Sequence, residues 1–150
     1  GTDDAGLCIV LEWVEGSDLK AFVKGNEPTA SLLIEVHGLL RDVSRGMQYL
    51  HSQQPVVLHR DLKPANILVE TSRKPAHAKI ADFGLSFLIE SRNPASRTGT
   101  KAYMAPEVFQ SKPYSRAADI FSFGCICFFV LTAQSPNPAS VLADVQELPA

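Results

Sequence analysis

The sequence has few of the features that would mark a membrane protein, a disulfide scaffold or a nucleic-acid-binding domain. Its most apolar run, residues 120–131, is much shorter than the roughly 20 residues that span a bilayer, and the N-terminal GTDDAG shows no targeting signal. The net charge of −2 argues against a nucleic-acid partner held by a basic surface. Its three cysteines, Cys8, Cys125 and Cys127, are an odd number, and the last two lie in an apolar run with no other His or Cys nearby at metal-ligand spacing. We therefore expect reduced core thiols and an intracellular protein.

What is present has the composition of a globular protein: 45% of the 150 residues are apolar and 20% are charged. That length suits one domain or a part of one. Residues 7–14 form a nearly continuous apolar run, which predicts a strand buried on both faces. Such a strand needs neighbours, and no obvious long partner follows. We therefore expect residues 1–150 to be the middle of a larger domain.

Helical periodicity occurs in two segments. Residues 31–51 repeat apolar side chains in steps of three and four, which predicts a long amphipathic helix with Ser31 near its cap. Residues 119–131 are apolar on all sides and predict a helix buried all round. Three short β-like pieces are expected at residues 56–58, 67–69 and 78–81, and the last two should form a hairpin. A long functional loop is expected at residues 84–105.

Polar side chains gather in HRDLKPAN, residues 59–66, directly after an apolar segment. Asp61, Lys63 and Asn66 lie within it, and a second acid, Asp82, opens Asp-Phe-Gly farther along. Carboxylate and amide oxygens with an ammonium group are the set expected around Mg²⁺ and phosphate oxygens rather than around zinc. The cluster therefore predicts a site that positions a phosphoryl group.

Three segments in this order, HRDLKPANIL, ADFGLS and YMAPE, resemble the catalytic loop, the metal-binding loop and the end of the activation segment of eukaryotic protein kinases. The resemblance implies an α+β, protein-kinase-like fold. Residues 1–14 would form the last strand of the N-terminal lobe and the hinge, and residues 15–150 a helical C-terminal lobe that is truncated after its buried central helix. The segments ADFGLS and DIFSFG are similar to the tyrosine-kinase-like group.

The resemblance also implies a role for each polar residue. Asp61 would be the base that accepts the proton of a substrate hydroxyl, and Lys63 would neutralise charge on the phosphoryl group transferred from ATP. Asn66 and Asp82 would hold Mg²⁺. A loose transition state needs positioning and cations more than covalent help. The alternative for any one of these residues alone is an ordinary capping or surface charge.

Around the nucleotide, the resemblance implies that Leu11 is the gatekeeper beside adenine and that Glu12 to Val14 form the hinge that hydrogen-bonds it. Asp18 would contact the ribose, and Leu68 would form the apolar floor under the base. Without the resemblance these residues would be core positions and a helix cap. For Leu11 and Leu68 both interpretations can hold together.

The activation segment is expected to control the site. Ser96 falls where kinases carry the primary activating phosphate, added by an upstream kinase or by autophosphorylation. A phosphate there could gain one to three charge-assisted hydrogen bonds, chiefly with Arg60. Ser91 and Thr98 are alternatives, and all three could be ordinary loop residues.

Two further features concern the hydroxyl that is phosphorylated and the supports of the site. The Lys of DLKPAN and the segment GTKAYMAPE are typical of serine/threonine kinases, and Thr100 is placed to hydrogen-bond Asp61 and Lys63. We therefore expect a protein substrate with a Ser or Thr.

The resemblance assigns structural roles to His59, Phe83, Glu107 and Asp119. Asp119 would anchor the catalytic loop through backbone hydrogen bonds, the alternative being a plain helix cap.

Some kinase parts do not occur in this sequence: it has no Gly-x-Gly, no strand lysine in a Val-Ala-Ile-Lys-like context and no upstream helix with its Glu. In the family these parts would precede Gly1, so we expect the chain by itself to bind ATP poorly and not to turn over. A pseudokinase, which binds partners without transfer, is the main alternative. A small-molecule phosphotransferase would show His-Gly-Asp at residues 59–61. A membrane tether elsewhere in a longer protein stays open, although we expect a cytoplasmic location.

Overall fold

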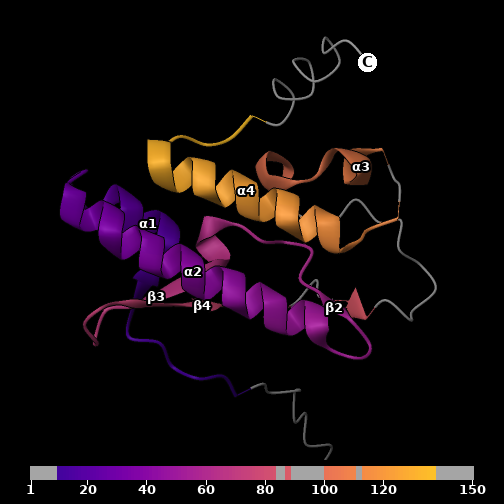
Figure 1. The fold of residues 1–150 in the computed structure, drawn as a ribbon, viewed down its shortest axis with the longest axis horizontal. Coiled ribbons are helices and arrows are strands. Elements are labelled where there is room, and N and C mark those ends of the chain that lie inside the picture. Colours follow the sequence, from indigo (N-terminus) through magenta and orange to yellow (C-terminus); the bar gives the residue numbers. More distant parts are fainter. Residues whose placement is uncertain (1–9, 84–86, 89–99, 111–112, 138–150) are drawn as a thin grey trace, which may run out of the picture.

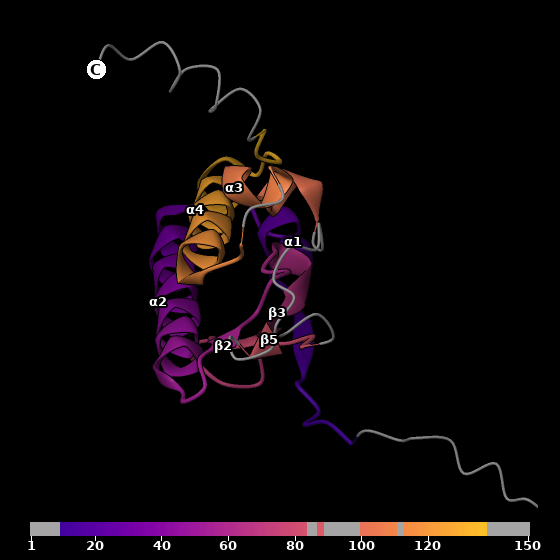
Figure 2. The same cartoon turned by 90° about the vertical axis from the view of Figure 1, so that its right-hand side faces the viewer.

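The computed structural model describes residues 10–83, 87–88, 100–110 and 113–137. Two long helices, α2 (Ala30–Ser52) and α4 (Arg116–Thr132), lie side by side, and a small sheet packs against α2 (Figures 1 and 2). The other elements are β1 (Gly16–Asp18), α1 (Leu19–Lys24), β2 (Val57–Leu58), the 3₁₀ helix η1 (Pro64–Asn66), β3 (Ile67–Glu70), β4 (His77–Ile80), β5 (Phe87–Leu88), the 3₁₀ helix η2 (Lys101–Tyr103) and α3 (Pro106–Phe109).

The long helix α2 confirms the helix predicted from periodicity at residues 31–51. It begins one residue earlier, because Thr29 rather than Ser31 is its cap: the Thr29 Oγ1 accepts a hydrogen bond from the Leu32 N–H at 3.2 Å. The apolar stripe of α2 is buried and contributes to the main core through Val36, Leu39, Val43 and Met47. Burying each such side chain contributes roughly 1.5–3 kcal/mol, so packing holds this helix in place.

The sheet has the order β1-β3-β4, with both pairs antiparallel. The predicted hairpin is confirmed, since Ile67 pairs with Ile80 and Glu70 with His77. The first strand joins through Gly16, whose φ is +154°. A Cβ at that position would lie 1.9 Å from the Val69 carbonyl oxygen, so only glycine permits this close approach.

The pair β2–β5 corrects the prediction of a long loop over residues 84–105. Phe87 and Leu88 form a short strand that pairs antiparallel with Leu58 and Val57. A two-residue strand leaves no periodic pattern in a sequence, so its pairing comes from the tertiary arrangement. The strand β2 confirms, one residue shorter, the β-like piece predicted at residues 56–58.

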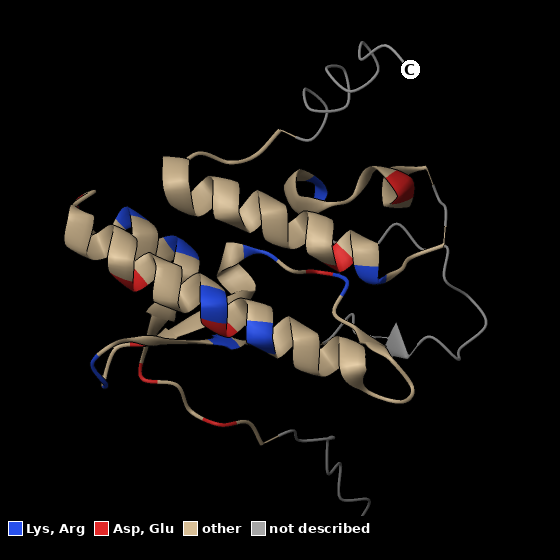
Figure 3. Cartoon of the chain, viewed as in Figure 1, with Lys and Arg blue, Asp and Glu red and all other residues tan. Residues whose placement is uncertain are grey.

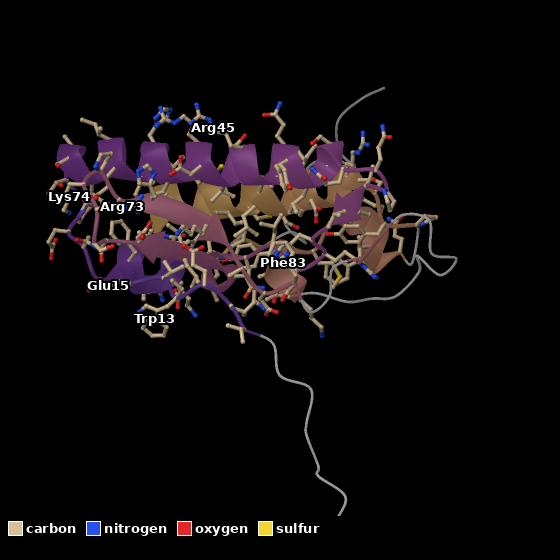
Figure 4. All side chains as sticks on the ribbon, turned by 90° about the horizontal axis from the view of Figure 1, so that it is seen from below. Trp13, Glu15, Arg45, Arg73, Lys74 and Phe83 are labelled. Atoms are coloured by element: carbon tan, nitrogen blue, oxygen red, sulfur yellow. The ribbon has the colours of Figure 1, made fainter. Side chains whose placement is uncertain are left out.

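The apolar segment at residues 7–14 is not the buried strand that the sequence predicts, as far as the structure describes it. Residues 10–14 are outside any strand, and Val10, Leu11 and Trp13 are 91%, 80% and 87% exposed. Both edges of β3 are taken, by β1 and β4, and no described strand lies beside residues 10–14. The segment therefore runs away from the body of the molecule, with the Trp13 side chain at its surface (Figures 2 and 4).

The apolar helix α4 is not buried all round, contrary to the prediction for residues 119–131. One face packs on α2 and η2. The opposite face, among the described residues, exposes Ile120, Phe128 and Leu131. An all-round apolar pattern predicts complete burial only when neighbours cover every face, and the described elements cover one side.

Two cysteines of α4, Cys125 and Cys127, are free thiols in half-buried positions. Burial raises the pKa of Cys125 to about 11 and also raises that of Cys127. Both thiols therefore stay protonated near neutral pH and behave as small apolar groups. Cys8 lies outside the described residues.

Candidate active site

The loop that contains HRDLKPAN is held by a buried carboxylate of α4. Asp119 is fully buried, and its two oxygens accept hydrogen bonds from the backbone N–H groups of His59 and Arg60, both at 3.0 Å. The same carboxylate contacts the His51 ring at 2.8 Å and accepts a bond from the Tyr114 hydroxyl at 2.9 Å. The expected backbone hydrogen bonds to Asp119 are therefore present. With four partners this acid is more than a helix cap.

His59 joins the loop to the segment that carries Asp82. Its buried ring accepts a long hydrogen bond from the Asp61 N–H at Nδ1, 3.4 Å away. Its Nε2 lies 3.0 Å from the Ala81 carbonyl oxygen, so the neutral tautomer with the proton on Nε2 satisfies both contacts. The ring also packs against Phe83, with 5.2 Å between centroids. The structure thus brings His59 and Phe83 together.

Asp61 is surrounded by donors. Its Oδ1 accepts from the Thr100 backbone N–H at 2.9 Å and from the Thr100 hydroxyl at 3.0 Å. Its Oδ2 accepts from Lys63 Nζ at 2.5 Å and from Asn66 Nδ2 at 3.2 Å. The expected bond between Thr100 and Asp61 is therefore present. Among the described contacts Thr100 has none with Lys63, because both of its bonds go to Oδ1 of Asp61.

The electrostatics of Asp61 follow from these donors. Burial by itself would raise the pKa of this carboxyl, but the hydrogen bonds from Lys63 and Thr100 outweigh burial and the pKa is lowered. Asp61 is therefore an anion at neutral pH. Figure 3 shows the loop as an acidic segment between two basic ones, close to the start of α4.

The β3–β4 hairpin explains why Asn66 and Asp82 are neighbours. Asn66 immediately precedes β3, and Ala81 immediately follows β4 at the same end of the hairpin. The Ala81 N–H donates to the Asn66 carbonyl oxygen at 2.9 Å. Asp82 is the next residue, exposed and with a φ of +60°, a conformation that aspartate tolerates better than most residues.

The oxygens at this end of the hairpin suit a magnesium ion. Asn66 uses its Nδ2 to donate to the backbone carbonyl of Asp61 at 2.9 Å as well as to its side chain, which leaves the Asn66 Oδ1 as a candidate metal ligand. Among the described residues no group of three or more His, Cys, Asp or Glu side chains could hold a metal. Mg²⁺ needs no such group, because it is commonly bound through one or two carboxylates with water and substrate phosphates.

The residues predicted to bind the nucleotide fall into two groups. Asp18 and Leu68 face each other across the β1–β3 pair, and Leu68 is half-buried. The Asp18 Oδ1 caps α1 by accepting from the Ala21 N–H at 2.8 Å, so the helix-cap interpretation holds for this residue. Leu11 and Glu12 are exposed, and Glu12 pairs with Lys79 Nζ at 2.7 Å.

The supports of the activation segment are described only in part. Arg60 is buried, with its guanidinium carbon 5.5 Å from the Tyr114 ring centroid. Glu107 is half-buried in the first turn of α3. The sites predicted for phosphorylation, Ser91, Ser96 and Thr98, lie outside the described residues. Val14 is half-buried and lies two residues before the start of β1.

Two residues of this site, His51 and Tyr114, were not predicted from the sequence. Both contact Asp119, and both come from outside the catalytic loop. His51 stands in the last turn of α2, and Tyr114 precedes α4. No motif or spacing in the sequence links them to Asp119, because their contact depends on how α2 and α4 pack.

Comparison with known proteins shows the family of the chain. The family model described as "Protein kinase domain" matches residues 2–147. The chain belongs to the protein kinase family. It is part of a protein kinase domain, with the α+β fold expected from the resemblance. Members of this family in general use ATP with a divalent cation and act on protein substrates.

Several curated kinases are similar in sequence. Serine/threonine-protein kinase VIK of Arabidopsis thaliana is 38% identical over 144 residues, which cover 90% of this kinase chain and 32% of the relative. Serine/threonine/tyrosine-protein kinase HT1 of the same plant is 39% identical over 130 residues, covering 86% and 32%. Serine/threonine-protein kinase CTR1, also of that plant, is 44% identical over 110 residues, covering 69% and 13%. The chain thus spans a third or less of the length of these relatives.

Proposed function

We propose that the protein carrying this kinase chain is a serine/threonine kinase that transfers the γ-phosphoryl group of ATP to Ser or Thr hydroxyls of proteins. The observation that carries the proposal is the environment of Asp61: an anionic carboxylate held by Lys63, Asn66 and Thr100, beside the two oxygens suited to Mg²⁺. The relatives named as serine/threonine kinases support the same activity.

In this proposal Asp61 orients the substrate hydroxyl and accepts its proton. A carboxylate offers about four lone-pair positions, and the structure fills them with two bonds to Oδ1 and two to Oδ2. A substrate hydroxyl therefore has to replace one existing donor. Lys63 is the donor best suited to leave, because its flexible ammonium can follow the negative charge of the transferring phosphoryl group.

Asn66 and Asp82 would hold the magnesium ion through their side-chain oxygens. When bound there, Mg²⁺ would supply positive charge that neutralises the phosphate oxygens. The hydrogen bond from the Ala81 N–H to the Asn66 carbonyl oxygen ties the backbone of Asn66 to the residue that precedes Asp82, which supports a shared metal position for the two side chains.

The nucleotide would lie near the β1–β3 pair. Leu68 would support the adenine from below and Asp18 would contact the ribose. Asp18 already accepts a bond from Ala21, and its second carboxylate oxygen remains the candidate for a ribose hydroxyl. Leu11, Glu12 and Val14 would border adenine as gatekeeper and hinge.

Activation would follow phosphorylation of Ser96, by an upstream kinase or by the protein itself. Arg60 would be the main partner of that phosphate. The positive φ of Arg60, +72°, places its backbone in a conformation that non-glycine residues adopt rarely, as is common at switch regions and active sites. Mass spectrometry of the active enzyme that finds Ser96 unmodified would contradict this assignment.

Boundaries, specificity and location complete the proposal. Residues 1–14 would belong to the last N-lobe strand and the hinge, and residues 15–150 to the C-terminal lobe. The preference for Ser and Thr over Tyr is open to test, since the relative HT1 is named for both classes.

The structure has no helix, in the part that it describes, with the length and apolar character of a membrane span. An intracellular, cytoplasmic location stays a proposal.

The experiment that tests the activity uses the full-length protein with radiolabelled ATP and a Ser/Thr peptide library. Asp61→Asn should cut transfer by about 10²-fold or more, because the proton acceptor is lost, while ATP binding is kept. Asp82→Asn should weaken Mg²⁺-dependent nucleotide binding. Glu27→Gln, at an exposed carboxylate, is the matched control. Wild-type rates in both active-site variants would overturn the mechanism, and binding without any transfer by the wild type would indicate a pseudokinase.

A further inference from the structure

Tyr114 is linked to the catalytic loop in two ways, indirectly through Asp119 of α4 and directly through the side chain of Arg60. Its hydroxyl donates to the Asp119 Oδ1 at 2.9 Å, and that same oxygen accepts the Arg60 backbone N–H at 3.0 Å. Its ring lies 5.5 Å from the guanidinium carbon of Arg60, a cation–π distance. Tyr114 therefore holds Arg60 from both sides, through the backbone by way of Asp119 and through the side chain directly.

The hydroxyl of Tyr114 is a permanent donor in this arrangement. Burial, followed by the negative charge of Asp119, raises the pKa of Tyr114 far above its ordinary value. The hydroxyl thus keeps its proton near neutral pH. Asp119 is fully buried and needs every donor that it has, because an unsatisfied buried carboxylate is costly.

The loop needs such support because the conformation of Arg60 is unfavourable. A φ of +72° is rarely adopted by a residue with a side chain, and it persists only where the surroundings over-determine it. Asp119 holds the Arg60 N–H, and the Tyr114 ring holds the guanidinium. The next residue along the chain is Asp61, so the φ of Arg60 decides where the Asp61 carboxylate points.

Tyr114 also lies close to the acid that performs the chemistry. A small cavity of about 10 Å³, the size of one water at most, is lined by Arg60, Asp61, Thr100 and Tyr114 among others. Little space therefore separates the tyrosine from the loop, and a change at Tyr114 is transmitted to Asp61 by direct packing.

We propose that Tyr114 is a positioning residue for phosphoryl transfer: its hydroxyl, through Asp119, and its ring, through Arg60, fix the backbone that aims Asp61. The inference rests on the proposed kinase activity. According to this proposal, Tyr114 affects the rate of phosphoryl transfer and not the affinity for ATP. The residue lies before α4 and outside the kinase motifs that the sequence analysis identified.

The first test compares Tyr114→Phe, which removes only the hydroxyl, with Tyr114→Leu, which also removes the ring. In the full-length protein kcat should fall about tenfold for Tyr114→Phe and by about 10² for Tyr114→Leu, because small displacements of a catalytic group are expensive. The KM for ATP should stay within about twofold, because none of the contacts described for Tyr114 is with a residue proposed to bind the nucleotide. Tyr49→Phe removes an exposed tyrosine hydroxyl from α2 and is the matched control.

The second test needs no activity. The backbone amides of His59 and Arg60 donate to Asp119, so their hydrogen exchange reports on the loop directly. In Tyr114→Phe these two amides should exchange about tenfold faster than in the wild type, while amides in the middle of α2 keep their rates. The Tyr49→Phe control should leave the His59 and Arg60 amides unchanged.

The outcomes separate this inference from the proposed function. Wild-type kcat together with wild-type exchange in Tyr114→Phe would overturn it. A lower melting temperature with an unchanged kcat per folded molecule would overturn it too, because the residue would then only stabilise the fold. If the wild-type protein transfers no phosphate, the proposed function fails, and the exchange rates still decide whether Tyr114 holds the loop.

Discussion

The catalytic loop and the N-terminal segment at residues 10–14 are both assigned to the active site by their resemblance to kinases, yet they differ in burial and in hydrogen bonding. The loop is irregular in backbone and buried, with Asp61 and Asn66 in a network of hydrogen bonds and His59 packed inside. The N-terminal segment is apolar and exposed, with Glu12 paired to Lys79 at the surface. The polar residues of the loop are thus held by hydrogen bonds, because their partners lie among the described residues. The apolar residues of the N-terminal segment stay exposed, because no described strand lies beside them.

The largest effect should come from breaking the loop at Asp119. Asp119→Ala removes the acceptor of two backbone amides and leaves the His51 and Tyr114 side chains without their shared partner. We expect a loss of about 3–5 kcal/mol in the free energy of unfolding, measured by denaturant titration of the full-length protein. Asp119→Asn, which keeps the shape and one acceptor oxygen, should cost clearly less. Equal stability of Asp119→Ala and the wild type would contradict the anchoring role.

The next effect concerns the place where the exposed segment ends and the sheet begins. Gly16→Ala puts a methyl group 1.9 Å from the Val69 carbonyl oxygen at a φ of +154°. The β1–β3 pair should then open, at a cost of about 2 kcal/mol or more. Heat denaturation measures the loss. Gly38→Ala is the control, because a Cβ at Gly38 in α2 would meet no atom within 4 Å and a helix favours alanine.

A smaller effect should follow from the charge of Asp61. Its lowered pKa means that the unfolded chain binds this proton more readily than the folded one. The stabilisation from Asp61 is therefore present above the unfolded pKa, near 3.8, and is lost as the pH falls through the folded pKa. The difference in unfolding free energy between the wild type and Asp61→Asn should be constant near neutral pH and shrink in acid. A difference that grows on acidification would contradict the sign of the shift.

The smallest effect should come from the exposed segment itself. Trp13→Ala in the 150-residue chain should change the unfolding free energy by less than about 0.5 kcal/mol, because the indole is 87% exposed. The same measurement on Leu19→Ala, which empties a fully buried position, should show a loss of about 2–5 kcal/mol. A large loss at Trp13 would mean that residues 10–14 pack on the body of the molecule.

Sequence reasoning was most accurate where the signal is local. The apolar repeat of α2 and the polar turn of the β3–β4 hairpin predicted both elements with boundaries within about one residue. It was wrong where burial depends on other elements: the strand expected around Leu11 and the complete burial of Phe128 both assume neighbours that the described chain does not supply. Periodicity shows which side chains prefer burial and not whether a partner covers them.

By itself, the sequence determined the chemistry of this protein: which residues carry carboxylates, amides and an ammonium group, and the order of motifs that places the chain among the protein kinases. Only the tertiary structure decided how those groups are held. Asp119 meets His51, Tyr114 and the catalytic loop because α2 and α4 pack together, and the backbone of Asn66 bonds to Ala81, the residue before Asp82, because a hairpin closes between them. A motif is a local pattern that can be recognised in the sequence. The donors of a buried carboxylate come from any elements that packing brings within hydrogen-bond distance, so they cannot be recognised in this way.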